Sequence, residues 1–262
     1  MSKISQFFRV TLRGIKLIVT VLLAMVTYFL TIKLLGRSGS IVARAAWVQQ
    51  QARRFLWALG VARCYEGTPP NHGVLVSNHV SYLDIIVLAA RMPMIFIAKA
   101  EVAHWPVFGP LTRFAGTLFI RRDRKSDVVR VAAEMAPVLD AGVPLAFFPE
   151  GTSSGGDRVL PFRASLLAPL VEKGWSVTPA FLHYELAPGD GVVADDVAYW
   201  RPEQEFGPHL LHLLGKRRIR AVVRYGQMQS PGDDRKELAT RLREAICQLG
   251  GMAEPVEVSE PV

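Results

Sequence analysis

The sequence predicts an α/β fold, in which a mixed, largely parallel sheet is flanked by helices and preceded by an N-terminal two-helix membrane anchor. Two observations lead to this prediction. From Gly73 onward, short β-rich runs alternate with helical patterns, which is typical of an α/β sandwich. Before that point the chain is basic and apolar instead. Its 262 residues, half of them hydrophobic, are enough for one domain of ordinary size with an appended element.

The excess of positive over negative charge lies entirely in the first quarter of the chain. Residues 1–65 contain ten Lys or Arg and no Asp or Glu, whereas the rest contains 21 basic and 23 acidic residues. Long aliphatic runs separate these basic residues, so we expect anionic membrane lipid as a partner and no nucleic acid. The chain thus divides into a membrane-associated helical pair at 1–65, a folded domain at 66–250 and an acidic tail at 251–262 that we expect to be disordered.

The two predicted helices of the first quarter differ in character. Residues 17–32 are uncharged, but a helix of this length spans about 24 Å, which is short against a hydrocarbon core of about 30 Å. Residues 40–59 show one apolar face, which suits either the headgroup region of a membrane or an amphipathic helix docked on the domain. Because basic residues flank the first helix on both sides, we expect both helices in one leaflet and the folded domain on the cytoplasmic face.

The remaining elements follow from hydrophobic periodicity. Short β-rich runs predict strands at residues 74–77, 94–98, 117–120, 144–148, 177–181 and 219–225. Helical spacing predicts helices at residues 82–90, 105–114, 126–139, 164–172 and 234–249. Chemistry in such folds gathers where strands end, so the polar residues that follow the strands are the candidates for a site.

Neither a disulfide framework nor a metal site is expected. Cys64 and Cys247 lie far apart in the sequence and match no metal-binding spacing, which indicates a reducing compartment. His209 and His212 have a spacing that could bind a metal, but the leucines around them favour a packed helix.

The first polar cluster follows the strand at 74–77 and contains Asn78, His79 and Asp84. Within one continuous helix, His79 and Asp84 would point about 140° apart and could not meet. If His79 lies in the loop before the helix, Asp84 can reach back to its ring from the first turn. Such a pair is a general base with an orienting carboxylate, without a nucleophile of its own. The alternative is a loop histidine bonded to backbone.

Two further clusters follow other strands. Residues 147–154 read Phe-Phe-Pro-Glu-Gly-Thr-Ser-Ser, which brings the carboxylate of Glu150 and several small residues to the end of a strand. Residues 116–125 run from a strand into a basic segment that includes Arg122. Taken alone, the former is typical of a turn and the latter of a solvated charge run.

Together, and in their order along the chain, the clusters resemble the membrane-bound glycerolipid acyltransferases, the lysophosphatidic acid acyltransferase superfamily. Residues 78–84 match the family block Asn-His-x-x-x-x-Asp, and residues 116–122 match Gly-x-x-Phe-Ile-x-Arg. Residues 148–152 match Phe-Pro-Glu-Gly-Thr, and residues 177–180 resemble a fourth block, an apolar strand with an internal proline. The resemblance covers about residues 70–225. Four ordered blocks are far more specific than any one of them.

The resemblance implies an enzyme that moves a fatty acyl group from an acyl thioester, acyl-CoA or acyl carrier protein, to the free hydroxyl of a lysolipid. His79 would remove the hydroxyl proton while Asp84 holds the imidazole. We therefore expect no acyl-enzyme and no cofactor, the acyl thioester being a co-substrate. The residues implied in substrate binding are Asn78, Arg122, Glu150, Gly151 and Thr152.

Two departures from the family blocks bear on the acceptor. Arg121 replaces a common aspartate, and Ser153 replaces a common arginine. The loss of the cation at position 153 weakens the case for a phosphate-bearing acceptor. Arg121, Arg158 or Arg163 could compensate, while residues 158–163 are similar to a sister branch that acylates lyso-ornithine lipid. Family frequency favours 1-acyl-sn-glycerol-3-phosphate as acceptor, giving phosphatidic acid. Lyso-ornithine lipid is the alternative acceptor, and a thioesterase-like hydrolase is the alternative from another class.

Overall fold

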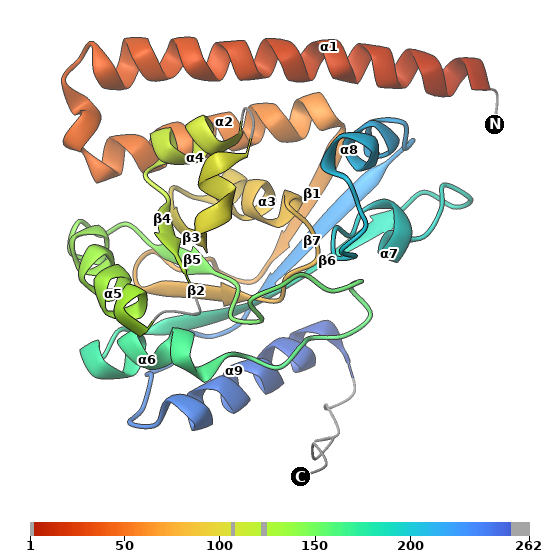
Figure 1. The fold of residues 1–262 in the computed structure, drawn as a ribbon. Helices are drawn as coiled ribbons and strands as arrows, with labels where there is room; N and C mark the ends of the chain where they lie inside the picture. The colour runs from red at the N-terminus through yellow and green to blue at the C-terminus, as the bar shows by residue number, and fades with distance from the viewer. Residues whose placement is uncertain (1–2, 106–107, 122–124, 253–262) are drawn as a thin grey trace.

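A seven-stranded mixed sheet forms the centre of the protein (Figure 1). The computed structural model describes residues 3–105, 108–121 and 125–252. The strands are ordered β1-β7-β6-β2-β5-β3-β4. Their bounds are β1 Val61–Glu66, β2 Val74–Ser77, β3 Ile95–Lys99, β4 Leu118–Ile120, β5 Leu145–Phe147, β6 Val177–Leu186 and β7 Ile219–Tyr225. Neighbouring strands run parallel except β6 and β7, so the largely parallel, mixed sheet is confirmed.

Helices cover both faces of this sheet (Figure 1). On one face lie α2, α3, α4 and α8, with the long α1 running across their outer side, and on the other face lie α5, α6 and α9. The helix bounds are α1 Lys3–Tyr28, α2 Ile41–Leu59, α3 Leu83–Arg91, α4 Phe108–Ala115, α5 Lys125–Asp140, α6 Ala164–Lys173, α7 Val193–Asp196, α8 Phe206–Leu214 and α9 Arg235–Gly250. A π-helix at Phe29–Lys33 continues α1, and 3-10 turns occur at Arg37–Gly39 and Ala100–His104.

Residues alternate along β6 between the two halves of the core. Leu182 and Tyr184 pack in the same cluster as Leu83 of α3, whereas Phe181 packs in the same cluster as Leu242 of α9. This alternation is the ordinary two-residue period of a strand, and a slip by one residue would reverse every side chain. The register between β6 and β2 is therefore firmly set beside the loop that follows β2.

The strands and helices predicted after residue 73 all occur, with ends that differ by a few residues. β6 continues to Leu186, because its antiparallel pairing with β7 extends beyond the predicted strand. The predicted helix at 105–114 is shorter, since α4 begins at Phe108. The packed helix favoured around His209 and His212 is α8. Residues 253–262, the larger part of the predicted disordered tail, lie outside the described residues.

β1 is a strand that the sequence pattern does not predict. It is an edge strand that pairs with β7 alone, and Ala62 and Arg63 are exposed along it. Its sequence, Val-Ala-Arg-Cys-Tyr-Glu, therefore shows neither a buried run nor a clean alternation. The predicted boundary between residues 65 and 66 falls inside this strand.

The second helix of the first quarter is part of the folded domain. α2 begins after Ser40, whose side chain accepts a hydrogen bond from the Ala43 N–H, and ends at Gly60 in the left-handed conformation, with φ +72°. Leu56 and Leu59 of its inner face are buried in the core that it shares with α3. α2 is thus an amphipathic helix docked on the domain. Of the two membrane helices that the sequence predicts, the described residues clearly contain one, which is α1.

That surface helix is longer than the predicted apolar segment. With the π-helix it runs continuously over Ile4–Lys33, and by length and composition it could cross a membrane. Arg9 donates a hydrogen bond to the carbonyl of Gly215 (3.1 Å), and Arg13 donates one to the carbonyl of Leu214 (3.1 Å). Carbonyls at the end of a helix have no partner within it, so these bonds both cap α8 and fasten α1 to the domain.

Candidate active site

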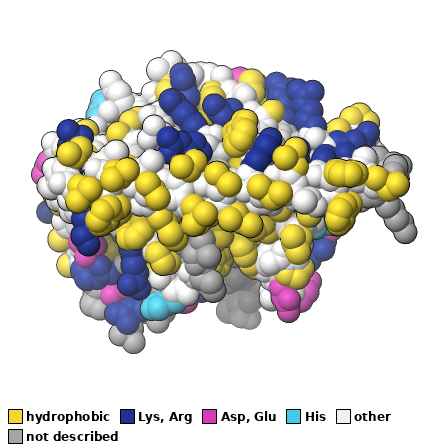
Figure 2. All heavy atoms as spheres, turned by 90° about the horizontal axis from the view of Figure 1, so that it is seen from above, with side chains coloured by type: hydrophobic (Ala, Val, Ile, Leu, Met, Phe, Trp, Pro, Cys, Tyr) yellow, Lys and Arg dark blue, Asp and Glu magenta, His cyan; other side chains and the backbone are white. Residues whose placement is uncertain are grey.

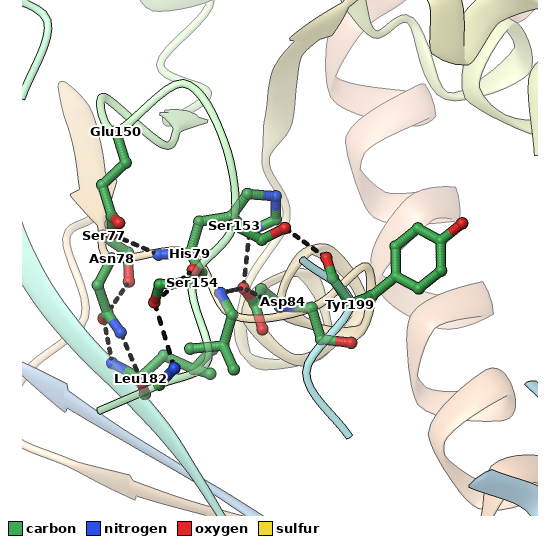
Figure 3. Close-up of polar contacts among 12 residues, drawn as sticks. Ser77, Asn78, His79, Asp84, Glu150, Ser153, Ser154, Leu182 and Tyr199 are labelled. Atoms are coloured by element: carbon green, nitrogen blue, oxygen red, sulfur yellow. Dashed lines mark hydrogen bonds and ion pairs between the residues drawn. The ribbon is translucent and has the colours of Figure 1, made fainter. Parts of the chain in front are cut away.

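The residue that follows β2 fastens the chain to the neighbouring strand β6. The side-chain amide of Asn78 donates a hydrogen bond to the Leu182 carbonyl (2.8 Å), and its oxygen accepts one from the Leu182 N–H (2.7 Å). An asparagine suits this position because it carries one donor and one acceptor group side by side. The two bonds extend the β2–β6 ladder and fix the point at which His79 leaves the sheet (Figure 3).

His79 lies in the loop before α3, and Asp84 lies in the first turn of that helix. Nδ1 of His79 is 2.7 Å from Oδ2 of Asp84, so the contact predicted from the spacing is confirmed. The same oxygen accepts the backbone N–H groups of Val80 (2.7 Å) and Ser81 (3.0 Å). Because a carboxylate only accepts hydrogen bonds, the imidazole donates through Nδ1 and keeps the lone pair of Nε2 for a proton. The His79 side chain is 21% exposed, whereas Asp84 is fully buried.

Phe148 sets the plane of the His79 ring. The two rings are stacked, with centroids 4.1 Å apart and planes at 10° to each other. Phe148 directly follows β5, which pairs with β2, so the two residues leave the sheet side by side. An imidazole held by a carboxylate at its edge and a ring on its face has a defined orientation, which a positioned base requires.

Glu150 holds the backbone around His79. It is 3% exposed, and its two oxygens accept hydrogen bonds from the N–H groups of His79 (2.8 Å) and Leu160 (3.1 Å). Burial raises the pKa of Glu150 to about 8, although both backbone N–H groups act in the opposite direction. The carboxyl group thus joins the loop after β2 to the loop that precedes α6.

The segment after Glu150 contacts the loop that carries His79 through Ser154 and the connection between α7 and α8 through Ser153 (Figure 3). The Ser154 N–H donates to the His79 carbonyl (2.8 Å). The Ser153 hydroxyl donates to the carbonyl of Tyr199, in the connection between α7 and α8. Tyr199 in turn donates its N–H to the Val80 carbonyl (2.9 Å). The catalytic loop, residues 78–82, is thus bonded both to the segment after Glu150 and to the connection between α7 and α8.

Six of the predicted site residues lie at this edge of the sheet, with Asp84 in the first turn of α3 and the other five in loops, namely Asn78, His79, Glu150, Gly151 and Thr152. Arg122 lies outside the described residues. The side chains of Asn78 and Glu150, which the resemblance assigns to substrate binding, have backbone groups of this chain as hydrogen-bond partners and shape the loop that carries His79. Contact with the acceptor stays a prediction for Asn78, Glu150, Gly151 and Thr152.

Sequence reasoning missed Tyr184, which lies on β6. Its hydroxyl donates a hydrogen bond to Oδ1 of Asp84 (2.6 Å). Tyr184 lies on the same face of β6 as Leu182, whose backbone groups bond to Asn78. The two-residue spacing between Leu182 and Tyr184 is the one feature of the sequence that could have indicated Tyr184. Using that feature requires knowing that β6 lies next to β2, which comes from the structure.

Comparisons with other proteins identify the class of this site. A sequence model of the family described as Acyltransferase matches residues 63–183. A protein of Brucella abortus named "Lyso-ornithine lipid O-acyltransferase" is 36% identical over 72% of this chain and 74% of its own. A protein of the same name from Pseudomonas aeruginosa is 34% identical over 86% of this chain and 94% of its own. The chain belongs to the acyltransferase family.

Two other relatives of this acyltransferase complete the comparison. A "1-acyl-sn-glycerol-3-phosphate acyltransferase" of Neisseria meningitidis is 38% identical over 56% of this chain and 58% of its own. The crystal structure of the 1-acyl-sn-glycerophosphate (LPA) acyltransferase PlsC from Thermotoga maritima has a TM-score of 0.58, covering 93% of this chain and 100% of that one. At 19% identity, this likeness shows the shared fold. The protein is thus an acyltransferase that acts on lysolipids.

Proposed function

We propose that this acyltransferase transfers a fatty acyl group from an acyl thioester to the free hydroxyl of lyso-ornithine lipid. Nε2 of His79 takes the hydroxyl proton while the hydroxyl oxygen attacks the thioester carbonyl. An ester C–O bond forms, the C–S bond breaks, and the thiolate leaves with the proton that His79 returns to it. The donor is acyl-CoA or acyl carrier protein, and no further cofactor takes part.

The contact between His79 and Asp84 supports this mechanism. A lipid hydroxyl holds its proton tightly, so it attacks a thioester well only when a base removes that proton in the transition state. A positioned general base contributes about 10²–10⁴-fold to such a step. The buried carboxylate of Asp84 then stabilises the imidazolium that forms, at a distance of 2.7 Å.

The choice of acceptor rests on Ser153. The family commonly carries arginine at this position, and a guanidinium is a strong bidentate ligand for phosphate. Here the side chain is neutral and its hydroxyl is bonded to the Tyr199 carbonyl. Three relatives that align over 72% to 91% of the chain are named as lyso-ornithine lipid O-acyltransferases. Both observations favour a phosphorus-free acceptor, which reverses the order that family frequency gives.

1-Acyl-sn-glycerol-3-phosphate is the second candidate acceptor. Two proteins named for that activity are 38% identical to this chain, over 44% and 56% of its length. Arg158, one of the cations that could replace the missing arginine, is exposed and paired with Asp157 at 2.8 Å. A surface ion pair of this kind is weak, so it leaves Arg158 able to bind a phosphate.

The test of the acceptor uses the purified protein in lipid vesicles with a labelled acyl thioester. We expect lyso-ornithine lipid to be acylated by the wild type, with lysophosphatidate a poor substrate. Ser153→Arg should weaken activity toward the aminolipid, because the new cation repels its ammonium group, and should raise activity toward lysophosphatidate. Gln248→Arg adds the same charge at an exposed position on α9 and should change neither rate. Faster acylation of lysophosphatidate by the wild type would establish the second candidate, and thioester cleavage without any acceptor would establish a hydrolase.

We further propose that α1 lies in the plane of the cytoplasmic leaflet. Seen from above, apolar side chains form a band across the molecule, with Lys and Arg beside it (Figure 2). The exposed apolar residues of α1 form a broad stripe that includes Ile4, Phe7, Phe8, Leu12, Ile15, Ile18, Val19, Leu22, Leu23, Met25 and Val26, and Phe29 of the π-helix that follows is exposed as well. Such a stripe buries well in the boundary between headgroups and acyl chains. The hydrogen bonds from Arg9 and Arg13 to α8 hold the helix flat on the domain.

Labelling in sealed vesicles tests this orientation. With Cys64 replaced by serine and Cys247 buried, a cysteine introduced at Lys3 or at Arg37 should in each case react with a membrane-impermeant reagent added on the cytoplasmic side. The two positions flank the long helix, so a spanning helix would expose them on opposite sides. Opposite-side labelling would therefore replace the in-plane arrangement with a true span.

A further inference from the structure

Asp84 divides its hydrogen bonds unequally between its two oxygens. Oδ2 accepts from the His79 ring and from two backbone N–H groups. Oδ1 faces β6, where the Tyr184 hydroxyl donates to it at 2.6 Å. Asp84 is fully buried and Tyr184 is 5% exposed, so both ends of this bond are shielded from water. A hydrogen bond to a charged group in such a place is stronger than one in water.

The position of Tyr184 follows from the strand register. β6 runs beside β2, and the clasp between Asn78 and Leu182 fixes the two strands at the base of the catalytic loop. Tyr184 is two residues further along β6, on the same face as Leu182, and therefore points at the first turn of α3. Burial raises the pKa of the Tyr184 hydroxyl well above its usual value, so it remains a donor wherever the enzyme works.

We propose that Tyr184 is a positioning residue of the His79–Asp84 pair, whose hydroxyl locks the carboxylate and moderates its attraction for the imidazole. The proposal rests on the general-base mechanism given above. The bond prevents the carboxylate from rotating, so Oδ2 stays in line with Nδ1. It also draws negative charge toward Oδ1, which moderates the attraction that Oδ2 exerts on a protonated imidazole.

Removal of the hydroxyl has two effects of definite sign. The carboxylate gains freedom to rotate, which lowers kcat because the base is less often aligned. More of its charge is directed at the His79 ring, which then keeps its proton at a higher pH, so the acidic limb of the activity profile moves upward. KM should stay close to that of the wild type, because Tyr184 is buried and its hydroxyl is bonded to Asp84.

Tyr184→Phe is the variant that removes the hydroxyl alone. Tyr225→Phe is its matched control: this tyrosine is buried on the adjacent strand β7, and its hydroxyl has no hydrogen-bond partner among the described residues. We expect Tyr184→Phe to lower kcat about 10-fold, with KM within about twofold of the wild type. The pH of half-maximal kcat/KM on the acidic side should rise by about half a unit. Tyr225→Phe should change none of these quantities.

A second substitution tests the same bond in the opposite direction. Site-specific replacement of Tyr184 by 3-fluorotyrosine makes the hydroxyl a stronger donor at nearly the same volume, and the acidic limb should then move to lower pH. Opposite shifts in the two variants are the signature of the bond itself, since a loss of packing would not change sign. If both variants keep the wild-type profile, Tyr184 is only a structural residue.

The failure of this proposal can be told apart from the failure of the mechanism on which it rests. If His79→Ala is inactive and the two Tyr184 variants behave as the wild type, the general base stands and the role of Tyr184 is rejected. If His79→Ala keeps wild-type turnover, the general-base mechanism itself is rejected, and the role of Tyr184 with it. Thermal unfolding of each variant at the assay pH shows that the folded enzyme is being measured.

Discussion

Two regions of the protein differ in where their side chains find partners: the catalytic edge, which is the edge of the sheet that carries His79, Asp84 and Glu150, and the surface of α1. At the catalytic edge, the polar groups of Asn78, Asp84 and Glu150 are buried, and each is bonded to other groups of the chain. On α1, a stripe of large apolar side chains is exposed. Buried polar groups are tolerated when they have partners, and exposed apolar stripes occur where a partner covers them. The polar groups of the first region thus have their partners within the chain, whereas we expect lipid to cover the second.

This contrast explains how the enzyme can use a substrate that lies in a membrane. The bonds of α1 to the end of α8 place the apolar stripe in a fixed relation to the domain. α2 lies between α1 and α3, and α3 carries Asp84. The exposed helix α1 is therefore connected to the His79–Asp84 pair through two packed helices, α2 and α3. Substitutions at the two ends of this connection should have different signatures.

The largest effect is expected at the catalytic edge, from His79→Ala. The variant should lose acyl transfer by about 10²–10⁴-fold, because no other base stands at this position. Its vesicle binding and thermal unfolding should match the wild type, since the ring lies in a loop and is partly exposed. Activity is measured with labelled acyl thioester and lysolipid.

Asp84→Asn is the companion to that variant, and it should be nearly as damaging. The amide keeps the size of the side chain but removes the charge that stabilises the imidazolium, and its NH₂ group would face donors of the chain. Near-normal turnover in either folded variant would break the assignment of this pair.

The next effect belongs to α1. Ile18→Asp together with Leu22→Asp places two charges in the exposed apolar stripe. We expect sedimentation with vesicles to fall by about 10-fold or more, because each charge must leave the apolar layer. Activity on vesicle-borne acceptor should fall in parallel, while activity on detergent-dispersed acceptor should persist. Val129→Asp, at an exposed valine of α5, is the control that should leave binding unchanged.

Equal losses of activity in vesicles and in detergent would contradict this prediction. They would mean that the charges disturb the domain itself, and that the stripe and the catalytic edge are not separable. Unchanged binding to vesicles would remove α1 as the membrane contact.

A smaller effect concerns Glu150, whose pKa is raised to about 8 by burial. A carboxyl group with a raised pKa binds more protons in the folded protein than in the unfolded chain, where the value is 4.5. The free energy of unfolding therefore falls as the pH rises from about 4.5 to about 8. Glu150→Gln removes this titration, so its unfolding temperature should decline less over that window, by about 3 °C or more.

Thermal unfolding of both proteins between pH 5 and pH 8 checks this expectation, and Glu172→Gln, at an exposed position on α6, is the control. Parallel curves for the wild type and Glu150→Gln would show that the two backbone N–H groups outweigh burial. The carboxyl group would then be charged throughout.

The sequence allowed much of this fold to be predicted, since strands buried on both faces read as short apolar runs between turn residues. It also predicted the contact between His79 and Asp84, because that contact depends on spacing within a single loop and helix turn. It could not predict the bonds made by Tyr184 and Leu182. These residues lie about 100 positions further along the chain, and their places depend on strand order. Glu150 was found as a motif residue, but its role came only from its backbone partners.

The smallest effect is expected at Ser153, and it separates a structural bond from a substrate contact. Ser153→Ala removes the hydrogen bond to the Tyr199 carbonyl, so the free energy of unfolding should fall by about 0.5–1.5 kcal/mol. The ratio of rates on lyso-ornithine lipid and lysophosphatidate should stay the same, because the hydroxyl is already occupied within the protein. Ser230→Ala, at an exposed position before α9, should change neither quantity. A changed ratio would show that Ser153 contacts the acceptor, and the catalytic edge would then have lipid as a partner, as we expect for α1.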